Sequence, residues 1–569
     1  MEATPRSQSN APRPPRLNGR PAALSTLAAL AAGLTLRLWM LKEFFEINGD
    51  SLIYGGLAKN LLLHGRYALN GEGGEMYSTL IRLPGYPLFM ALCFRLFGME
   101  NYYSVALAQI ALELAGCLLI AAFVRRIATP ETASGAAQCA LWLAALCPFT
   151  AVYAAAPLTE TPTLFAIALA LWAMARFCAK PGWRGALLFT FAVTFAALLR
   201  PDGALVAIAL APAMLVGLRG AANAAGARAR APLHYVAMAY GRKPGPFFVG
   251  RVSILKAGTG APAMEGQGPR PLDGATAALD GEKIKIVAAV KGTPPHEETP
   301  IEKAAALAAA RRRLVRIVLA CLLLALTPFA VWTVRNWRVF HVFEPLAPRY
   351  ATDPGETTYP GWQRWVKTWC LDFVSTYEVY WPVPGSPLDL SKLPSRAFDS
   401  PAQYAETAAL AADYNDAEDI TPELDARFAR LAGERIASHP LRYYIVLPLG
   451  RMADMWLRPR VDNLPIDLDW WVYAHHNAET RFSWFYAALN AFYLLLAIAG
   501  LCMRPRFWPW MLAYIVLRSA LLMTIEAPEA RYTLECFPML FALGGIALYR
   551  LLYAVCLLVG KVNASPGKV

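Results

Sequence analysis

Residues 21–50 read PAALSTLAALAAGLTLRLWMLKEFFEINGD, an apolar run that ends near Leu41 and is followed by the carboxylate of Asp50. A helix needs roughly 20 apolar residues to cross the hydrocarbon core of a membrane. Because the run is too long for the core of a signal peptide, we predict an uncleaved signal anchor. Asp50 would then lie just outside the first membrane helix, which indicates chemistry at the membrane surface.

The composition favours a membrane protein. Of the 569 residues, 56% are hydrophobic and 17% are charged, whereas soluble proteins carry about 25% charged residues. The net charge is +13, but the basic residues cluster at alternate ends of the apolar spans, as the positive-inside rule predicts. This pattern argues against a nucleic-acid partner. All ten cysteines except Cys370 lie in apolar stretches, so we expect neither a disulfide nor a cysteine zinc site in the polar region after residue 335.

Further apolar stretches follow the first, and we predict about ten transmembrane helices. The predicted spans are roughly 22–41, 102–124, 132–152, 157–178, 185–200, 203–218, 314–334, 482–502, 507–525 and 533–556. With the N-terminus inside, the arginine and lysine clusters fall at the inner ends of the spans. We therefore expect an integral protein of a bacterial inner membrane, with both termini in the cytoplasm.

The spans divide the chain into regions. We predict a disordered cytoplasmic N-terminus (1–20), an N-terminal membrane module (21–218) with a first external loop (42–101), a cytoplasmic linker or insertion (219–313), a transmembrane helix (314–334), a mainly helical external region (335–481), C-terminal transmembrane helices (482–557) and a cytoplasmic tail (558–569).

Two polar regions outside the spans contain apolar or aromatic stretches. Residues 84–98 in the first external loop form an apolar run that is too short to cross, so we expect an amphipathic helix in the outer interface. The external region contains Trp362, Trp365 and Trp369. We expect these rings to belong to an interfacial belt or a core, with stacking on sugar rings as the alternative.

Asp50 begins a segment with helical periodicity. Leu52, Leu57 and Leu61 recur on one side of it. Asp50 would then lie in the first helical turn, where the helix dipole favours an ionised carboxylate. A general base needs this charge and this exposure. The alternative is an aspartate that only caps the helix.

Further charged residues lie at boundaries on the same predicted side of the membrane. Glu160 begins the fourth span, Arg200 follows the fifth, Arg335 follows the seventh and Arg531 precedes the tenth. Charged groups at such depths are costly and usually face a cavity, although a single arginine can also snorkel for structural reasons. Their shared side favours one pocket, in which carboxylates could activate an acceptor and arginines could hold a phosphate.

These motifs resemble the GT-C membrane glycosyltransferases, in particular the protein O-mannosyltransferase-like and lipid A aminoarabinose transferase-like branch. The first loop carries the resemblance at Asp50, Tyr54, Gly65-Arg66-Tyr67 and Arg82-Leu83-Pro84-Gly85-Tyr86-Pro87. It continues at Leu158-Thr159-Glu160, Leu199-Arg200-Pro201, Pro328 with Arg335-Asn336, and Arg531-Tyr532 with Pro538. It covers most of the membrane part, does not cover 219–313 and covers 335–481 only weakly.

The resemblance implies an all-α GT-C fold and an inverting transfer of a sugar from a polyprenyl-phosphate donor to a protein, glycan or lipid acceptor outside the cytoplasm. Asp50 would be the catalytic base and Glu160 a second acidic site residue. The donor phosphate would be bound by Arg200, Arg335 and Arg531. The further candidate site residues are Tyr54, Arg82, Tyr86 and Tyr532.

Whether the protein uses a divalent metal as a cofactor is left open by the sequence. Some relatives use one, but the first loop of this chain contains neither a DxD nor a Lys-Pro-Pro run.

Two other classes of function compete with the enzyme. A transporter or flippase for a lipid-linked or amphipathic substrate would use the same cavity and arginines without needing Asp50 as a base. A membrane scaffold would use the external region to bind a partner. The sequence shows no internal repeat, and many transporters contain one. We therefore prefer the glycosyltransferase.

Overall fold

The computed structural model describes residues 20–71, 73–228, 276–279, 282–285, 300–472 and 477–563. All but residue 20 of the predicted N-terminal tail (1–20), residues 564–569 of the predicted C-terminal tail, and most of the predicted insertion lie outside the described residues. The chain divides into two compact units, residues 1–217 with 317–569 and residues 218–316. In the second unit, strands β3 (Thr276–Leu279) and β4 (Glu282–Lys285) pair as an antiparallel hairpin.

The described part of the first unit is helical apart from one short hairpin, which confirms the predicted all-α class. Its N-terminal helices are α1 (Arg20–Phe44), α2 (Gly49–His64), α3 (Gly85–Phe97), α4 (Tyr102–Ile127), α5 (Ala133–Ala145), α6 (Pro148–Ala155), α7 (Glu160–Ala179), α8 (Trp183–Leu199) and α9 (Ala204–Arg228). Strands β1 (Ala68–Asn70) and β2 (Met76–Ser78) form the hairpin between α2 and α3.

The later elements follow the insertion. The helices are α12 (Pro300–Phe340), α13 (Pro360–Lys367), α14 (Phe373–Ser375), α15 (Pro401–Ala417), α16 (Pro422–Ser438), α17 (Leu447–Leu457), α18 (Asn477–Cys502), α19 (Trp508–Leu522) and α20 (Phe537–Asn563). Short 3-10 helices are η1 (Pro201–Gly203), η3 (Leu390–Lys392), η4 (Ser395–Ala397) and η6 (Ala530–Cys536). Two π-helical turns are η2 (Thr376–Tyr380) and η5 (Arg442–Val446).

The helices confirm a membrane protein with many spans. Among the described residues, 6 helices are long and apolar enough to cross a membrane, and the bent pair α5–α6 makes up to 7. Shorter apolar helices coincide with three more predicted spans: α8, the first part of α9, and α19. The predicted count of about ten therefore stays a prediction. Helix α3 is also short and apolar, at the place where we predicted an interfacial helix.

Two predicted spans differ from the helices observed. The span at 132–152 is broken by a 49° bend between α5 and α6, because Pro148 cannot donate a backbone hydrogen bond and begins a new helix. The span at 314–334 is part of the longer α12, which continues past Arg335 to Phe340. The helix ends at Phe340, because the next residue, His341, has a φ of 58° that lies outside the helical region.

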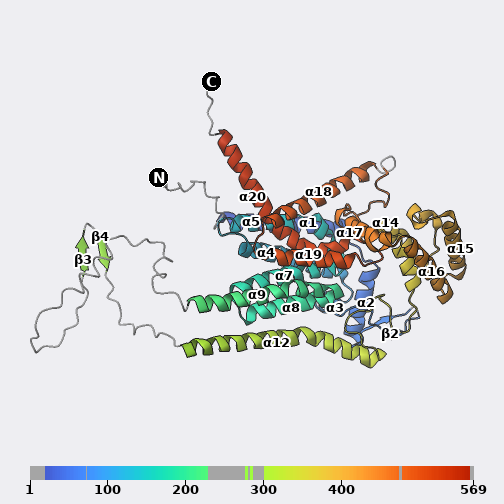
Figure 1. The fold of residues 1–569 in the computed structure, drawn as a ribbon, viewed down its shortest axis with the longest axis horizontal. Coiled ribbons are helices and arrows are strands. Elements are labelled where there is room, and N and C mark those ends of the chain that lie inside the picture. The colour runs from blue at the N-terminus through green and yellow to red at the C-terminus, as the bar shows by residue number, and fades with distance from the viewer. Residues whose placement is uncertain are drawn as a thin grey trace, which may run out of the picture. The chain divides into compact units, whose positions relative to one another are not determined.

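The membrane helices pack closely. Helices α4, α7 and α8 lie side by side, and α20 packs against both α5 and α18 (Figure 1). A Cβ atom placed on Gly545 of α20 would lie 2.5 Å from the Cβ atom of Ala140 in α5. Small residues therefore let these two backbones approach each other.

The tryptophans of the predicted external region form a core. Trp362, Trp365 and Trp369 are buried and pack with Phe428 of α16. Of the alternatives left open by the sequence, core packing is confirmed for these rings.

Candidate active site

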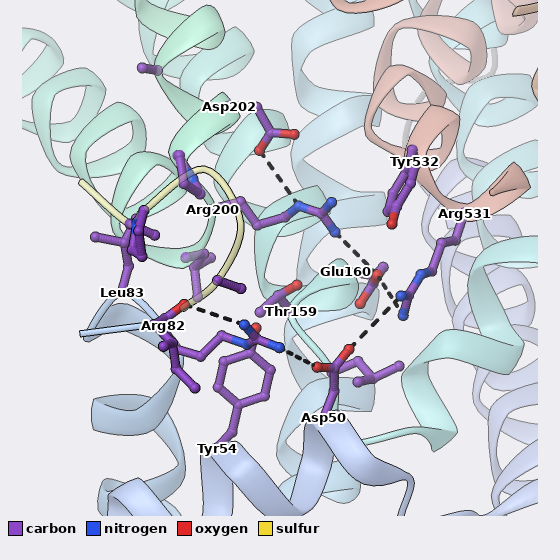
Figure 2. Close-up of a pocket in the computed structure, with 18 of the residues that line it drawn as sticks. Asp50, Tyr54, Arg82, Leu83, Thr159, Glu160, Arg200, Asp202, Arg531 and Tyr532 are labelled. Carbon is purple, nitrogen blue, oxygen red and sulfur yellow. Dashed lines mark hydrogen bonds and ion pairs between the residues drawn. The ribbon is translucent and has the colours of Figure 1, made fainter. Parts of the chain in front are cut away.

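One cavity of about 630 Å³ collects polar and charged side chains from distant segments (Figure 2). They come from α2, the turn before α3, the start of α7, the turn between α8 and α9, the strap after α12, and η6. Cavities of this size commonly hold small-molecule ligands. The polar lining consists of Asp50, Tyr54, Arg82, Thr159, Glu160, Arg200, Asp202, Arg349, Arg531 and Tyr532.

Asp50 lies in the first turn of α2, as predicted. The capping residue is Asn48, whose Oδ1 accepts a hydrogen bond from the backbone N–H of Ser51 at 3.0 Å. Asp50 is therefore not needed as a cap. The Ser51 hydroxyl also donates to the carbonyl of Pro157 at 3.0 Å. This contact ties the start of α2 to the segment before Glu160 and holds Asp50 at the cavity.

Two arginines flank the Asp50 carboxylate (Figure 2). Arg82 Nη2 donates to Oδ1 at 2.8 Å, and Arg531 Nη2 lies 3.9 Å from Oδ2. Burial raises the pKa of Asp50, but the attraction of Arg82, Arg531 and Arg200 outweighs burial and holds this pKa below the ordinary value of 3.8. Asp50 is therefore ionised at neutral pH.

The Tyr54 ring packs against the guanidinium group of Arg82. The guanidinium of Arg82 lies 5.9 Å from the centroid of the Tyr54 ring, a cation–π distance. The Arg82 carbonyl accepts a hydrogen bond from the Tyr67 hydroxyl at 2.9 Å. Burial raises the pKa of Tyr54 to about 12, so this phenol is neutral.

Glu160 lies between two of the cavity arginines, Arg200 and Arg531. Its Oε1 atom accepts from Arg200 Nη1 at 3.2 Å and lies 3.8 Å from Arg531 Nη1. The Tyr532 ring lies beside both guanidinium groups, with centroid distances of 5.3 Å to Arg200 and 5.6 Å to Arg531. Two cations thus converge on one point, an arrangement suited to an anion with several oxygens.

The structure brings together all the predicted site residues except Arg335 and Tyr86. Arg335 is turned toward the β1–β2 segment, where it donates to the carbonyls of Thr79 and Tyr67 at 2.8 Å each. Tyr86 is fully buried against the Tyr54 ring, with ring centroids 4.9 Å apart, and its hydroxyl donates to Gln109 Oε1 at 2.6 Å. Both residues support the walls and do not line the cavity.

The sequence reasoning missed Arg518 and Glu535. Arg518 lies inside the apolar helix α19, and Glu535 lies in η6 just before α20; both are buried. A charged residue inside an apolar segment is itself a signal, because such a residue needs a partner or a cavity. The sequence does not show which residues those partners are.

A divalent ion does not fit the residues present. Within the described ranges, no group of three or more His, Cys, Asp or Glu side chains is arranged to hold a metal. The three carboxylates that line the cavity, Asp50, Glu160 and Asp202, are already paired with arginines, whereas Mg²⁺ and Ca²⁺ need several oxygen ligands.

Comparisons with known proteins give one family match. Residues 82–228 match the family model described as dolichyl-phosphate-mannose-protein mannosyltransferase. No curated protein sequence matches the chain. The solved structures that are similar include ArnT from Cupriavidus metallidurans bound to undecaprenyl phosphate, with 12% identity over 92% of this chain and 77% of that chain, and a TM-score of 0.32. The apo state of the same protein gives 13% identity, 93% and 77% coverage, and a TM-score of 0.30.

The family match bears directly on the cavity. The matched segment contains Arg82, Glu160 and Arg200, which all line it. The predicted resemblance is confirmed for this part of the chain: residues 82–228 are similar in sequence to the dolichyl-phosphate-mannose-protein mannosyltransferase family.

Proposed function

We propose that this protein is an inverting glycosyltransferase that moves a sugar from a polyprenyl-phosphate donor to an acceptor on the extracytoplasmic side of the membrane. The observation that carries the proposal is the ionised carboxylate of Asp50 facing the same cavity as the guanidinium groups of Arg200 and Arg531. The family match of residues 82–228 supports the class of reaction.

Arg200 and Arg531 would bind the donor phosphate. Their Nη1 atoms lie 3.2 Å and 3.8 Å from the same oxygen of Glu160, so a phosphate oxygen at this place could reach both. Glu160 keeps the two like charges together while no anion is bound. Charge-assisted hydrogen bonds of this kind are stronger than neutral ones.

The remaining wall suits a lipid. Leu83, Leu158, Leu205 and Leu521 line the cavity next to the cations. A phosphate joined to an isoprenoid chain could therefore place its charge between the arginines while the chain stays in apolar surroundings.

Asp50 would act as the base. The acceptor oxygen or nitrogen attacks the anomeric carbon, its proton passes to Asp50, and the bond from that carbon to the phosphate oxygen breaks. The polyprenyl phosphate leaves with the electron pair, and Arg200 and Arg531 stabilise its growing charge. One displacement inverts the anomeric centre and needs a single base. Because the pKa of Asp50 is low, the proton moves late, when the attacking atom has become acidic.

The decisive experiment replaces Asp50 by asparagine in protein reconstituted into nanodiscs with synthetic polyprenyl-phosphate sugars. We expect Asp50→Asn to reduce transfer about 10³-fold, within the range for losing a general base, and to keep donor binding. Asp372→Asn is the matched control, because Asp372 is similarly exposed (27% against 32%), is also paired with an arginine and lies outside the cavity.

Two outcomes would contradict the proposal. Transfer by Asp50→Asn at the wild-type rate would remove Asp50 from the reaction. Substrate flux across vesicles without any acceptor, together with no detectable transfer by the wild type, would favour the transporter.

A further inference from the structure

Arg518 is a buried cation that the proposed reaction does not use. It lies in α19, its side chain is 0% exposed, and it does not line the cavity. A buried, unpaired charge would strongly destabilise the fold. The contacts of Arg518 therefore indicate what it does.

Its guanidinium group contacts two carboxylates and a backbone carbonyl. Nη2 donates to Glu535 Oε1 at 2.9 Å, and Nη1 pairs with Asp202 Oδ2. Nε and Nη2 donate to the carbonyl of Tyr532 at 3.1 Å and 3.0 Å. Arg518 thus connects α19, η6 and the turn between α8 and α9.

The same two carboxylates also hold Arg200. Its Nε atom lies 3.2 Å from Glu535 Oε1 and 3.5 Å from Asp202 Oδ1. Two arginines and two carboxylates therefore alternate in a closed set, the charge ring of Arg200, Asp202, Arg518 and Glu535. The ring engages the Nε edge of Arg200 and leaves Nη1 to meet Glu160 at the cavity.

We propose that Arg518 is a positioning residue for the phosphate-binding arginines. Through Asp202 and Glu535 it fixes the Nε edge of Arg200, and through the Tyr532 carbonyl it fixes the segment that carries Arg531. This inference rests on the proposed function, because it assigns a role toward the donor phosphate.

The loss of Arg518 would shift Arg200 away from the cavity. Asp202 and Glu535 would then share one cation instead of two, and the surplus negative charge would draw Arg200 away from Glu160 and the cavity. The Tyr532 carbonyl would also lose the Arg518 donors, which loosens η6. A misplacement of about 1 Å can cost about 100-fold in rate.

The test compares Arg518→Met, Arg518→Lys and the double variant Arg518→Met with Asp202→Asn. We measure kcat and KM for the lipid donor, corrected for folded protein. Arg518→Met should lower kcat about 100-fold, the effect of a slightly misplaced charge, with a smaller change in KM because the lipid chain still binds. The double variant should recover part of kcat, since it removes the surplus negative charge. Arg518→Lys should fall between Arg518→Met and the wild type, because lysine keeps the charge and lacks the planar fork.

Arg37→Met is the matched control. Arg37 is also 0% exposed, pairs with buried Glu113 at 2.6 Å and lies outside the cavity. It should lower the thermal stability and leave kcat per folded molecule near the wild-type value.

Three results would overturn the inference. In the first, folded Arg518→Met keeps the wild-type kcat. In the second, Arg37→Met and Arg518→Met lose stability and kcat in the same proportion. In the third, the double variant recovers none of the kcat that Arg518→Met loses. If Arg518→Met does not fold, wild-type kcat in Arg518→Lys overturns the inference. A wild-type protein without any transfer would instead contradict the proposed function itself.

Discussion

At the scale of single residues, the contact between Arg82 and Asp50 sets the protonation of the proposed base. Burial alone would raise the pKa of Asp50, and the 2.8 Å contact with Arg82 is the largest of the effects that lower it. A depressed pKa means that Asp50 loses its charge only when the pH falls below 3.8. The wild-type rate should therefore not fall because of Asp50 between mildly acidic and neutral pH.

Arg82→Met should raise the pH at which Asp50 becomes protonated and the rate falls. Without the arginine, burial dominates and the pKa of Asp50 rises, so the acidic limb of the pH–rate profile shifts upward. The measurement is kcat/KM for the donor across the acidic and neutral range. Lys59→Met provides the control, because Lys59 pairs with Glu100 outside the cavity. An unchanged acidic limb in Arg82→Met would show that Asp50 is not the group titrating.

At the scale of elements, the close approach of α20 and α5 depends on glycine. A Cβ atom on Gly545 would meet Ala140 at 2.5 Å, whereas a Cβ atom on Gly433 in α16 would meet nothing within 4 Å. The same substitution should therefore have opposite effects in the two helices.

Gly545→Ala should destabilise the protein by about 1–3 kcal/mol, as overpacking does. Gly433→Ala should be neutral or stabilise by up to about 1 kcal/mol, because alanine is the better helix former. Thermal unfolding in the same detergent compares the two variants. A stability of Gly545→Ala equal to that of the wild type would mean that the two helices can separate without cost.

The helices also show what the sequence could and could not predict. Apolar length predicted the positions of the apolar helices, and charges at their boundaries predicted that Asp50, Glu160, Arg200 and Arg531 face one cavity, because burial costs act on each residue directly. Arg335 is also a boundary charge, but the carbonyls of the β1–β2 segment satisfy it. The partners of Arg335 lie 256 and 268 residues away in the sequence, so local sequence patterns cannot predict them. The pairing of Arg518 with Asp202 could not be predicted for the same reason.

At the scale of the whole molecule, the proposal needs the cavity to open outside the cytoplasm. A cysteine placed at Glu100, near α3, should react with a membrane-impermeant maleimide in intact cells. A cysteine at Arg504, after α18, should react only after the membrane is permeabilised. The background should lack the exposed Cys502 and Cys556. The reverse pattern of labelling would put Asp50 in the cytosol and contradict the extracytoplasmic reaction.

Glu160, shared by Arg200 and Arg531, has a consequence for turnover. The spent carrier is a phosphate monoester, whose charge of about −1.5 to −2 at neutral pH exceeds that of the donor diester and would hold it in the site. Because Glu160 offers both guanidinium groups another counter-ion, it favours exchange of the used lipid for a fresh one. Glu160→Gln should therefore bind the spent carrier more tightly, which is measured as stronger product inhibition. Unchanged product inhibition would show that Glu160 does not promote release of the spent carrier.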